Sequence, residues 1–357
     1  MRQSGLLALF GVTVAAVIVA VAISLGGNGA AINATADRPV LPGLTGNLEQ
    51  VTHLAVVKGD TKLTLAKKDG AWVVEDKSGY PADAAKVRRV LLGFAALRYA
   101  EPKTKKPDLY GRLDVQDPGK KGDDSRLVTL SGDTGQLMGE LIVGKRRYDT
   151  FGGGNDGVYI RKPGEAQSWL AAGTLDMPNE TIDWLDRKLT EIGLDKVKSV
   201  SFVAADGAKL TIAREKEGAP LAIEGGLPAG SKLKNPEGLN DAARALAFFD
   251  FDDAKPAADM PFPDTGNAQA IYTLLDGVSL TITLMDKDEP PKPDAKPEDK
   301  PKKKHWVKIA AAGTGDAAKA ADAFNKKFAP WVYAIPDFKA NVFGTKLSDL
   351  TEPEKQS

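Results

Sequence analysis

Short stretches of alternating apolar and polar residues recur along the chain, and such alternation is typical of half-buried β-strands. Charged residues and glycine separate these stretches, which come in two sets of three: 53–57, 62–66 and 71–74, then 200–203, 209–213 and 221–223. Strands joined by turns this short pair with their neighbours in antiparallel order. Each set therefore predicts a three-stranded antiparallel meander.

A helix is expected after each meander. Pro81 and Pro236 each begin a run in which apolar residues recur at spacings of three and four, and proline is favoured in the first turn of a helix. The apolar positions are Val87, Val90, Leu91, Phe94 and Leu97 in the first run and Leu239, Ala242, Leu246 and Phe249 in the second. Each helix would bury one apolar stripe against a sheet.

Further strands and a shared closing phrase predict that the two halves are copies of one unit. The additional strands are expected at 127–130, 137–143 and 158–160 and at 270–274, 280–284 and 306–309. The closing phrases are the two similar short sequences that end the halves, at 187–192 and 345–350. We therefore expect an α+β fold in which two tandem copies of an antiparallel-sheet-plus-helix unit occupy 49–195 and 196–350, with a tail at 351–357.

The apolar run 6–25 is predicted to be a transmembrane signal-anchor helix. It carries no charge, and about twenty residues of helix match a hydrocarbon core of about 30 Å. Arg2 precedes it, so the positive-inside tendency places 1–5 in the cytoplasm and the bulk of the chain outside it. Residues 26–48, rich in Gly, Ala, Pro and Asn, are expected to form a flexible stalk.

A cleaved signal peptide is the alternative for this N-terminus. Ala34-Thr35-Ala36 offers a small-x-small site before Asp37. The apolar run is longer than the core of most cleaved signals and lies well upstream of that site, which favours an uncleaved anchor.

Residues 286–304 mix proline with both signs of charge, and such a composition cannot bury apolar surface. Because strands are expected on both sides, we interpret this segment as a disordered hairpin insertion. A tether or a docking site for a charged partner is the alternative interpretation.

Composition excludes several kinds of chemistry. Lys plus Arg and Asp plus Glu are equal at 48 each, so the chain lacks the overall basic excess that a nucleic-acid or anionic-membrane binder usually carries, which disfavours both as partners. Without cysteine and with only His53 and His305, the chain cannot form a thiolate zinc site, a disulfide or a cysteine nucleophile. No catalytic, cofactor-binding or metal-ligating residue is assigned from the sequence, and no cofactor is expected.

Two glycine-containing motifs match the sequence patterns of nucleotide-binding loops but not the structural context that such loops require. The run 139–145 has most of a P-loop, but Arg146 replaces the Ser or Thr that should follow the lysine, and a strand is expected inside it. Gly152, Gly154 and Gly157 precede a strand, whereas a dinucleotide motif follows one. We interpret 152–157 as a hairpin loop, and ligand binding by Asn155 and Asp156 is the alternative.

Clustered carboxylates, aromatic residues and histidines are also interpreted structurally. Asp250, Asp252 and Asp253 are expected in a solvated turn with Phe249 and Phe251 turned inward, a metal site being the alternative. The two histidines are expected to be structural or solvated. Four tryptophans are interpreted as core anchors, with an aromatic ligand cage as the alternative: Trp169, Trp184, Trp306 and Trp331.

The amino-acid sequences of four segments are similar to those of a known family. The runs 157–161, 168–170, 183–187 and 331–339 resemble those of the bacterial domain-of-unknown-function family 4340. This resemblance implies a single-pass inner-membrane protein that faces the periplasm and is often encoded beside gliding-motility-type ABC transporters. It implies no activity and no catalytic residues.

Two functions from different classes follow from these observations. The first is a non-enzymatic, membrane-anchored periplasmic protein that serves as an accessory or scaffold subunit of an ABC-type transporter or another envelope complex. The second is an envelope hydrolase or carbohydrate-modifying enzyme that uses carboxylates. The first is favoured because no motif lies in a context that supports chemistry.

Overall fold

The computed structural model describes residues 37–289 and 302–354. The predicted cytoplasmic N-terminus 1–5, the predicted transmembrane run 6–25 and residues 26–36 of the predicted stalk lie outside the described residues. No helix within the described ranges is long and apolar enough to cross a membrane. The chain divides into two compact units between Leu185 and Asp186.

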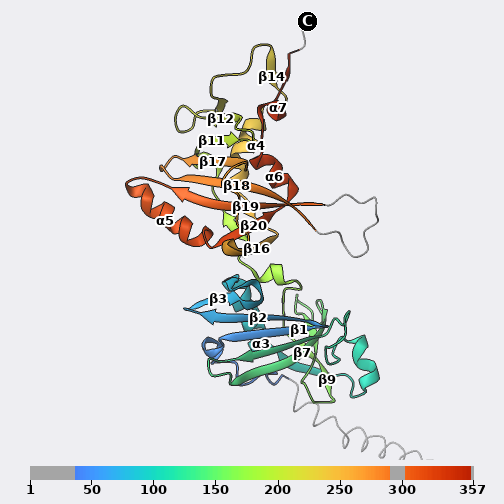
Figure 1. Cartoon of the computed structure of the whole chain (residues 1–357). Coiled ribbons are helices and arrows are strands. Elements are labelled where there is room, and N and C mark those ends of the chain that lie inside the picture. The colour runs from blue at the N-terminus through green and yellow to red at the C-terminus, as the bar shows by residue number, and fades with distance from the viewer. Residues whose placement is uncertain (1–36, 290–301, 355–357) are drawn as a thin grey trace, which may run out of the picture. The chain divides into compact units, whose positions relative to one another are not determined.

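The first unit is built on a nine-stranded antiparallel sheet with the order β4-β3-β2-β1-β6-β7-β8-β9-β5 (Figure 1). Its elements are β1 (His53–Lys58), β2 (Thr61–Lys68), β3 (Ala71–Val74), β4 (Tyr80–Pro81), α3 (Ala84–Ala96), β5 (Arg98–Pro102), β6 (Arg126–Ser131), β7 (Leu137–Arg147), β8 (Gly157–Arg161) and β9 (Ser168–Ala172). Short 3-10 helices occupy Leu48–Gln50, Glu75–Lys77, Pro107–Arg112 and Thr181–Trp184.

Helix α3 supplies the apolar stripe that the sequence predicts. Val87, Val90, Leu91 and Phe94 are all buried. The helix begins later than expected, because Pro81 lies in the edge strand β4 and the side chain of Asp83 caps the helix by accepting a hydrogen bond from the Lys86 amide at 3.1 Å.

Residues 37–47, inside the range predicted to be a stalk, contact the first unit. Val40 and Leu44 are fully buried, and the hydroxyl of Thr45 donates to the carbonyl of Ala95 at 3.3 Å. Packing therefore begins before the first strand of the meander.

The second unit contains an eight-stranded antiparallel sheet with the order β13-β12-β11-β17-β18-β19-β20-β16. Its elements are β10 (Lys188–Thr190), β11 (Val197–Val203), β12 (Lys209–Ala213), β13 (Ala222–Ile223), β14 (Ser231–Leu233), α4 (Gly238–Ala243), β15 (Phe249–Asp250), β16 (Asp253–Pro256), β17 (Gln269–Leu274), β18 (Ser279–Asp288), β19 (Lys303–Ala312), α5 (Asp316–Phe328), β20 (Trp331–Ile335), α6 (Asp337–Phe343), α7 (Leu347–Leu350) and β21 (Thr351–Pro353). Short 3-10 helices occupy Leu194–Lys196, Arg244–Leu246 and Ala257–Asp259.

Aromatic rings fill the core of the second unit. The ring of Phe343, from α6, lies 4.9 Å from that of Phe249, and the ring of Phe251 lies 5.2 Å from that of Tyr333. All four side chains are buried. The contact of Phe343 with Phe249 anchors α6, which also contacts β18 and β19 and forms one wall of the site described below.

The predicted α+β fold of two tandem sheet-plus-helix copies is wrong. Antiparallel strands dominate the described residues of both units, and most of the helices are short. The closing phrases that look alike differ in structure, because 188–190 form β10, which pairs with β15, whereas 347–350 form helix α7. Helix α3 has 13 residues but α4 has six.

The expected hairpin insertion does lie between two paired strands. Strands β18 and β19 continue into the range 286–304, where Asp286 pairs with His305 and Asp288 with Lys303. Residues 290–301 lie outside the described residues.

Candidate functional site

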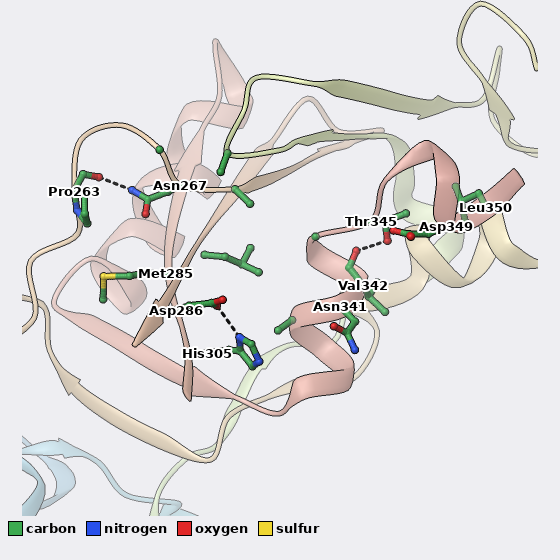
Figure 2. A pocket seen from close by; sticks show the side chains of 16 residues that line it. Pro263, Asn267, Met285, Asp286, His305, Asn341, Val342, Thr345, Asp349 and Leu350 are labelled. Atoms are coloured by element: carbon green, nitrogen blue, oxygen red, sulfur yellow. Dashed lines mark hydrogen bonds and ion pairs between the residues drawn. The ribbon is translucent and has the colours of Figure 1, made fainter. Parts of the chain in front are cut away.

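A cavity of about 830 Å³ lies in the second unit between the β18–β19 hairpin, α6 and α7 (Figure 2). Cavities that bind small ligands or side chains have volumes of roughly 300–1,000 Å³. The loop before β17 supplies one wall with Pro263 and Asn267, and the segment from α6 to α7 supplies the opposite wall. The cavity is therefore large enough for a ligand.

Apolar side chains form much of the cavity wall. Leu284 and Met285 come from β18, and Val342 and Leu350 come from the helical side. Leu284 and Met285 both line the cavity although they are neighbours in one strand. Apolar walls favour an occupant with an apolar part.

His305 stands at one end of the cavity with a carboxylate near each ring nitrogen. It pairs with Asp286 across the hairpin, and Nδ1 lies 2.7 Å from Oδ1 of Asp286. Nε2 lies 3.5 Å from Oδ1 of Asp337, the first residue of α6. A doubly protonated imidazole in this position can donate to both carboxylates and join the hairpin to α6.

The other end of the cavity is polar. Oδ2 of Asp349 accepts a hydrogen bond from the amide of Lys346 at 2.8 Å, and the buried hydroxyl of Thr345 donates to the carbonyl of Val342 at 2.7 Å. Asn341 is exposed on the cavity rim. Asp349 forms no ion pair within the described residues.

Two smaller cavities adjoin the first. One of about 590 Å³ shares His305 and is lined by Asp252, Glu289, Asp337 and the lysines 302–304, so it is highly charged. One of about 260 Å³ shares Val342, Thr345, Asp349 and Leu350 with the main cavity. The segment from α6 to α7 thus contributes residues to all three cavities.

A buried lysine lies on the other side of α6. Lys339 is 8% exposed, and its ammonium group donates to the carbonyl of Ala245 at 2.8 Å. Burial lowers the pKa of Lys339, while the charge of Asp250 opposes this effect. Lys339 does not line the main cavity, so we assign it a packing role.

The glycine motifs lie where the sequence interpretation places them. The run 139–145 is part of β7, and 152–157 lies mainly in the loop between β7 and β8. Within that loop Asp156 is buried and bonds to Arg146, while the Asn155 side chain donates to the Gly152 carbonyl. Both polar groups have partners that stabilise the loop itself.

The acidic cluster and the tryptophans also have structural surroundings. Arg187 lies 3.8 Å from Asp250 and 3.5 Å from Asp252, and Lys304 lies 3.5 Å from Asp253. The inward positions of Phe249 and Phe251 are confirmed. Trp184 and Trp306 are buried as expected, whereas Trp169 and Trp331 are half-buried.

The described residues offer little for a metal ion. Within 37–289 and 302–354, no group of three or more His, Asp or Glu side chains is arranged to hold a metal.

Sequence reasoning missed most of the cavity. His305 was interpreted as structural or solvated, and Asn341, Thr345 and Asp349 were not singled out. The pairing of Asp286 with His305 could have been anticipated from a hairpin register that starts at the expected strands 280–284 and 306–309. No local signal marks the α6–α7 wall, because it forms only when distant segments pack together.

A family model described as Domain of unknown function (DUF4340) matches residues 72–293, which is more than half of the chain. The chain belongs to this family. No curated protein and no solved structure matches it. The match spans parts of both units, including β18, but ends before His305 and α6.

Proposed function

We propose that this chain is a non-enzymatic protein, tethered on the periplasmic side of the bacterial inner membrane, that binds a partner protein through its second unit. The cavity between the β18–β19 hairpin and α6–α7 carries the proposal, because it combines apolar walls with carboxylates at both ends. The uncharged apolar run 6–25 supports the tether.

The partner segment that fits this cavity carries an apolar side chain next to a basic one. Asp349 lacks an ion-pair partner among the described residues, so a cation from the partner would neutralise it. Asp286 already lies near His305 and Lys303, at 2.7 and 3.7 Å, and is less available. The cavity end at Asp349 is therefore the expected position of the basic group.

Because the chain is tethered to the membrane, weak binding through this cavity is sufficient for function. Two proteins held in one membrane meet at high effective concentration, so weak contacts can maintain an assembly. The family resemblance supports an ABC-type transporter, or another envelope complex, as the class of partner. An accessory or scaffold subunit needs no chemistry of its own.

Site-specific photo-crosslinking in cells tests this proposal. A photoreactive amino acid at Asn341, on the cavity rim, should form an adduct with a membrane protein. The matched control is Phe338, which is 62% exposed on the same helix but lies outside the cavity. Adducts of equal yield at both positions, or at Phe338 alone, would contradict the assignment of the cavity.

One observation favours the second candidate function, an envelope hydrolase. A carboxylate 2.7 Å from Nδ1 of a histidine beside a cavity is the arrangement used to orient a general base. However, Nε2 also faces a carboxylate, that of Asp337, at 3.5 Å, so the ring is surrounded by negative charge rather than presented to a nucleophile. Hydrolysis of an envelope substrate by the purified chain, lost in His305→Gln, would establish this candidate.

A further inference from the structure

The first described residues of the chain lie along the edge strand β5. The Asp37 amide donates to the carbonyl of Tyr99 at 2.7 Å, and the Tyr99 amide donates to the carbonyl of Arg38 at 3.0 Å. Pro39 and Arg98 form an antiparallel bridge. These contacts hold the first described residues alongside β5.

Covalent geometry limits how far β5 can be from the apolar run. Eleven residues, 26–36, separate the run 6–25 from Asp37. A chain of that length spans at most about 40 Å when fully extended, and a flexible one has a root-mean-square span of about 18 Å. If the run lies in a bilayer, β5, which holds Asp37, therefore lies within about 40 Å of that bilayer.

Two exposed lysines follow the C-terminal end of β5, where hydrogen bonds fix the backbone. The side chains of Lys105 and Lys106 are exposed, and neither pairs with a carboxylate within the described residues. The preceding residue, Thr104, is fixed by the buried side chain of Ser168: the hydroxyl accepts from the Thr104 amide at 3.0 Å and donates to the Thr104 carbonyl at 2.9 Å.

The charges beside these lysines are already balanced or few. Lys103 pairs with Glu101 at 2.5 Å, and the other acidic residues at this end are Asp108 and, in the turn between β8 and β9, Glu165. The unpaired lysines therefore give this end of the strand a local positive charge.

An aromatic pair lies beside the lysines. The rings of Tyr99 and Trp169 are 4.9 Å apart, and both side chains are half-buried. Tyrosine and tryptophan are enriched at the headgroup level of membranes, because each combines an apolar ring with a polar tip. Trp169 pairs with Pro102 at the end of β5, which places it next to the lysine segment.

We propose that the C-terminal end of β5 rests on the membrane surface, with the ammonium groups of Lys105 and Lys106 on phospholipid phosphates and Trp169 at headgroup level. The inference rests on the tether of the proposed function. It adds that one end of the sheet of the first unit contacts the membrane. The partner is a bilayer containing anionic phospholipids.

The structure also provides a control position at the opposite end of the same strands. In β8 and β9, Arg161 pairs with Ser168 at the end near the lysines, and Gly157 pairs with Ala172 at the other end. The loop that precedes Gly157 carries Tyr148, whose side chain is 75% exposed. A label at Tyr148 should therefore lie far from the bilayer.

Because the chain has no cysteine, single labelled cysteines can report distance from the membrane. Full-length Ala166→Cys and Tyr148→Cys variants would each carry a fluorophore and be placed in nanodiscs of phosphatidylcholine and phosphatidylglycerol with nitroxide-labelled headgroups. Ala166 is exposed in the turn between β8 and β9 at the lysine end. We expect quenching at 166 to exceed that at 148 by about threefold.

A charge variant tests the role of the lysines. In the 166-labelled chain, Lys105→Gln with Lys106→Gln should reduce quenching at least twofold. Equal quenching at 166 and 148, or stronger quenching at 148, would overturn the orientation, and unchanged quenching in the double variant would overturn the lysine contact. Failure of the chain to remain with nanodiscs after alkaline carbonate would instead reject the tether, so the two failures are distinguishable.

Discussion

Arg146 and Asp156 are joined by two hydrogen bonds in the first unit: Nε and one terminal nitrogen of the guanidinium donate to Oδ2 of Asp156 at 2.9 and 2.5 Å. The other carboxylate oxygen accepts from the Asp149 amide at 3.0 Å. The Asp149 amide, followed by the Arg146 guanidinium, lowers the pKa of Asp156 below its ordinary value. The buried carboxylate thus organises the loop between β7 and β8.

This pairing predicts an acid-dependent loss of stability. Because the folded-state pKa of Asp156 lies below the unfolded value of about 3.8, its stabilisation is present above that pH and is lost as the pH falls through the folded-state pKa. Asp156→Asn should reduce stability at pH 7 and less at pH 3. Urea unfolding at both pH values measures the difference.

Asp176 is the control for that prediction. It lies 3.5 Å from Arg146 and its side chain is 60% exposed, so Asp176→Asn should have a smaller effect at pH 7. Equal losses in the two variants, or a loss in Asp156→Asn that does not change with pH, would contradict the account of the loop.

Close packing of the backbone is predicted to require glycine at position 144. A Cβ at this position would lie 2.1 Å from the Leu113 carbonyl oxygen and 2.8 Å from that of Asp114. Backbone atoms cannot move aside easily, so Gly144→Ala should lower the free energy of unfolding by about 2–3 kcal/mol. The same change at Gly139, also in β7, meets only the flexible Leu41 side chain at 3.0 Å and should cost less.

Denaturant unfolding of the two alanine variants checks this explanation. Equal stability of the two would show that close approach of the backbone does not explain Gly144. The result also bears on the P-loop resemblance, because it assigns the glycine a role within the sheet.

Burial of Lys339 predicts that the free energy of unfolding rises as the pH is raised above neutrality. Its folded-state pKa lies below the ordinary 10.5, so the cost of burying the charge is present at neutral pH and is relieved as the pH rises through the folded-state pKa toward 10.5. Lys339→Met removes both this cost and the hydrogen bond to Ala245. The variant should lose the rise in stability between pH 7 and pH 10, and an unchanged rise would contradict the assignment.

The sequence predicts most strands but little of the way in which distant segments meet. Alternation of period two located β1, β2 and β11 closely, because each strand has one buried face. Helix α5 was missed, since two of its three buried positions, Ala317 and Ala321, are alanines that contribute little hydrophobic signal, and the third, Phe328, is its last residue. Pro81 was interpreted as helical because a proline before a helix and a proline in an edge strand look alike in sequence.

The duplication was inferred from phrases whose structure depends on tertiary partners. Residues 188–190 become β10 because β15 lies alongside, while 347–350 form a short helix whose first turn is closed by Asp349. Such differences do not depend on local propensity. The cavity was not predictable for the same reason, since Leu284, His305 and Val342 meet only after the hairpin and α6 have packed together.

Recovery of the partner from membranes tests the central claim most directly. Full-length wild-type chain, Asn341→Arg, Phe338→Arg and His305→Gln would be crosslinked mildly in native membranes, and the amount of the protein identified by crosslinking at position 341 would be quantified. We expect at least a tenfold loss with Asn341→Arg, a smaller loss with His305→Gln because His305 lines one end of the cavity, and nearly wild-type recovery with Phe338→Arg. Wild-type recovery with Asn341→Arg would contradict binding through the cavity.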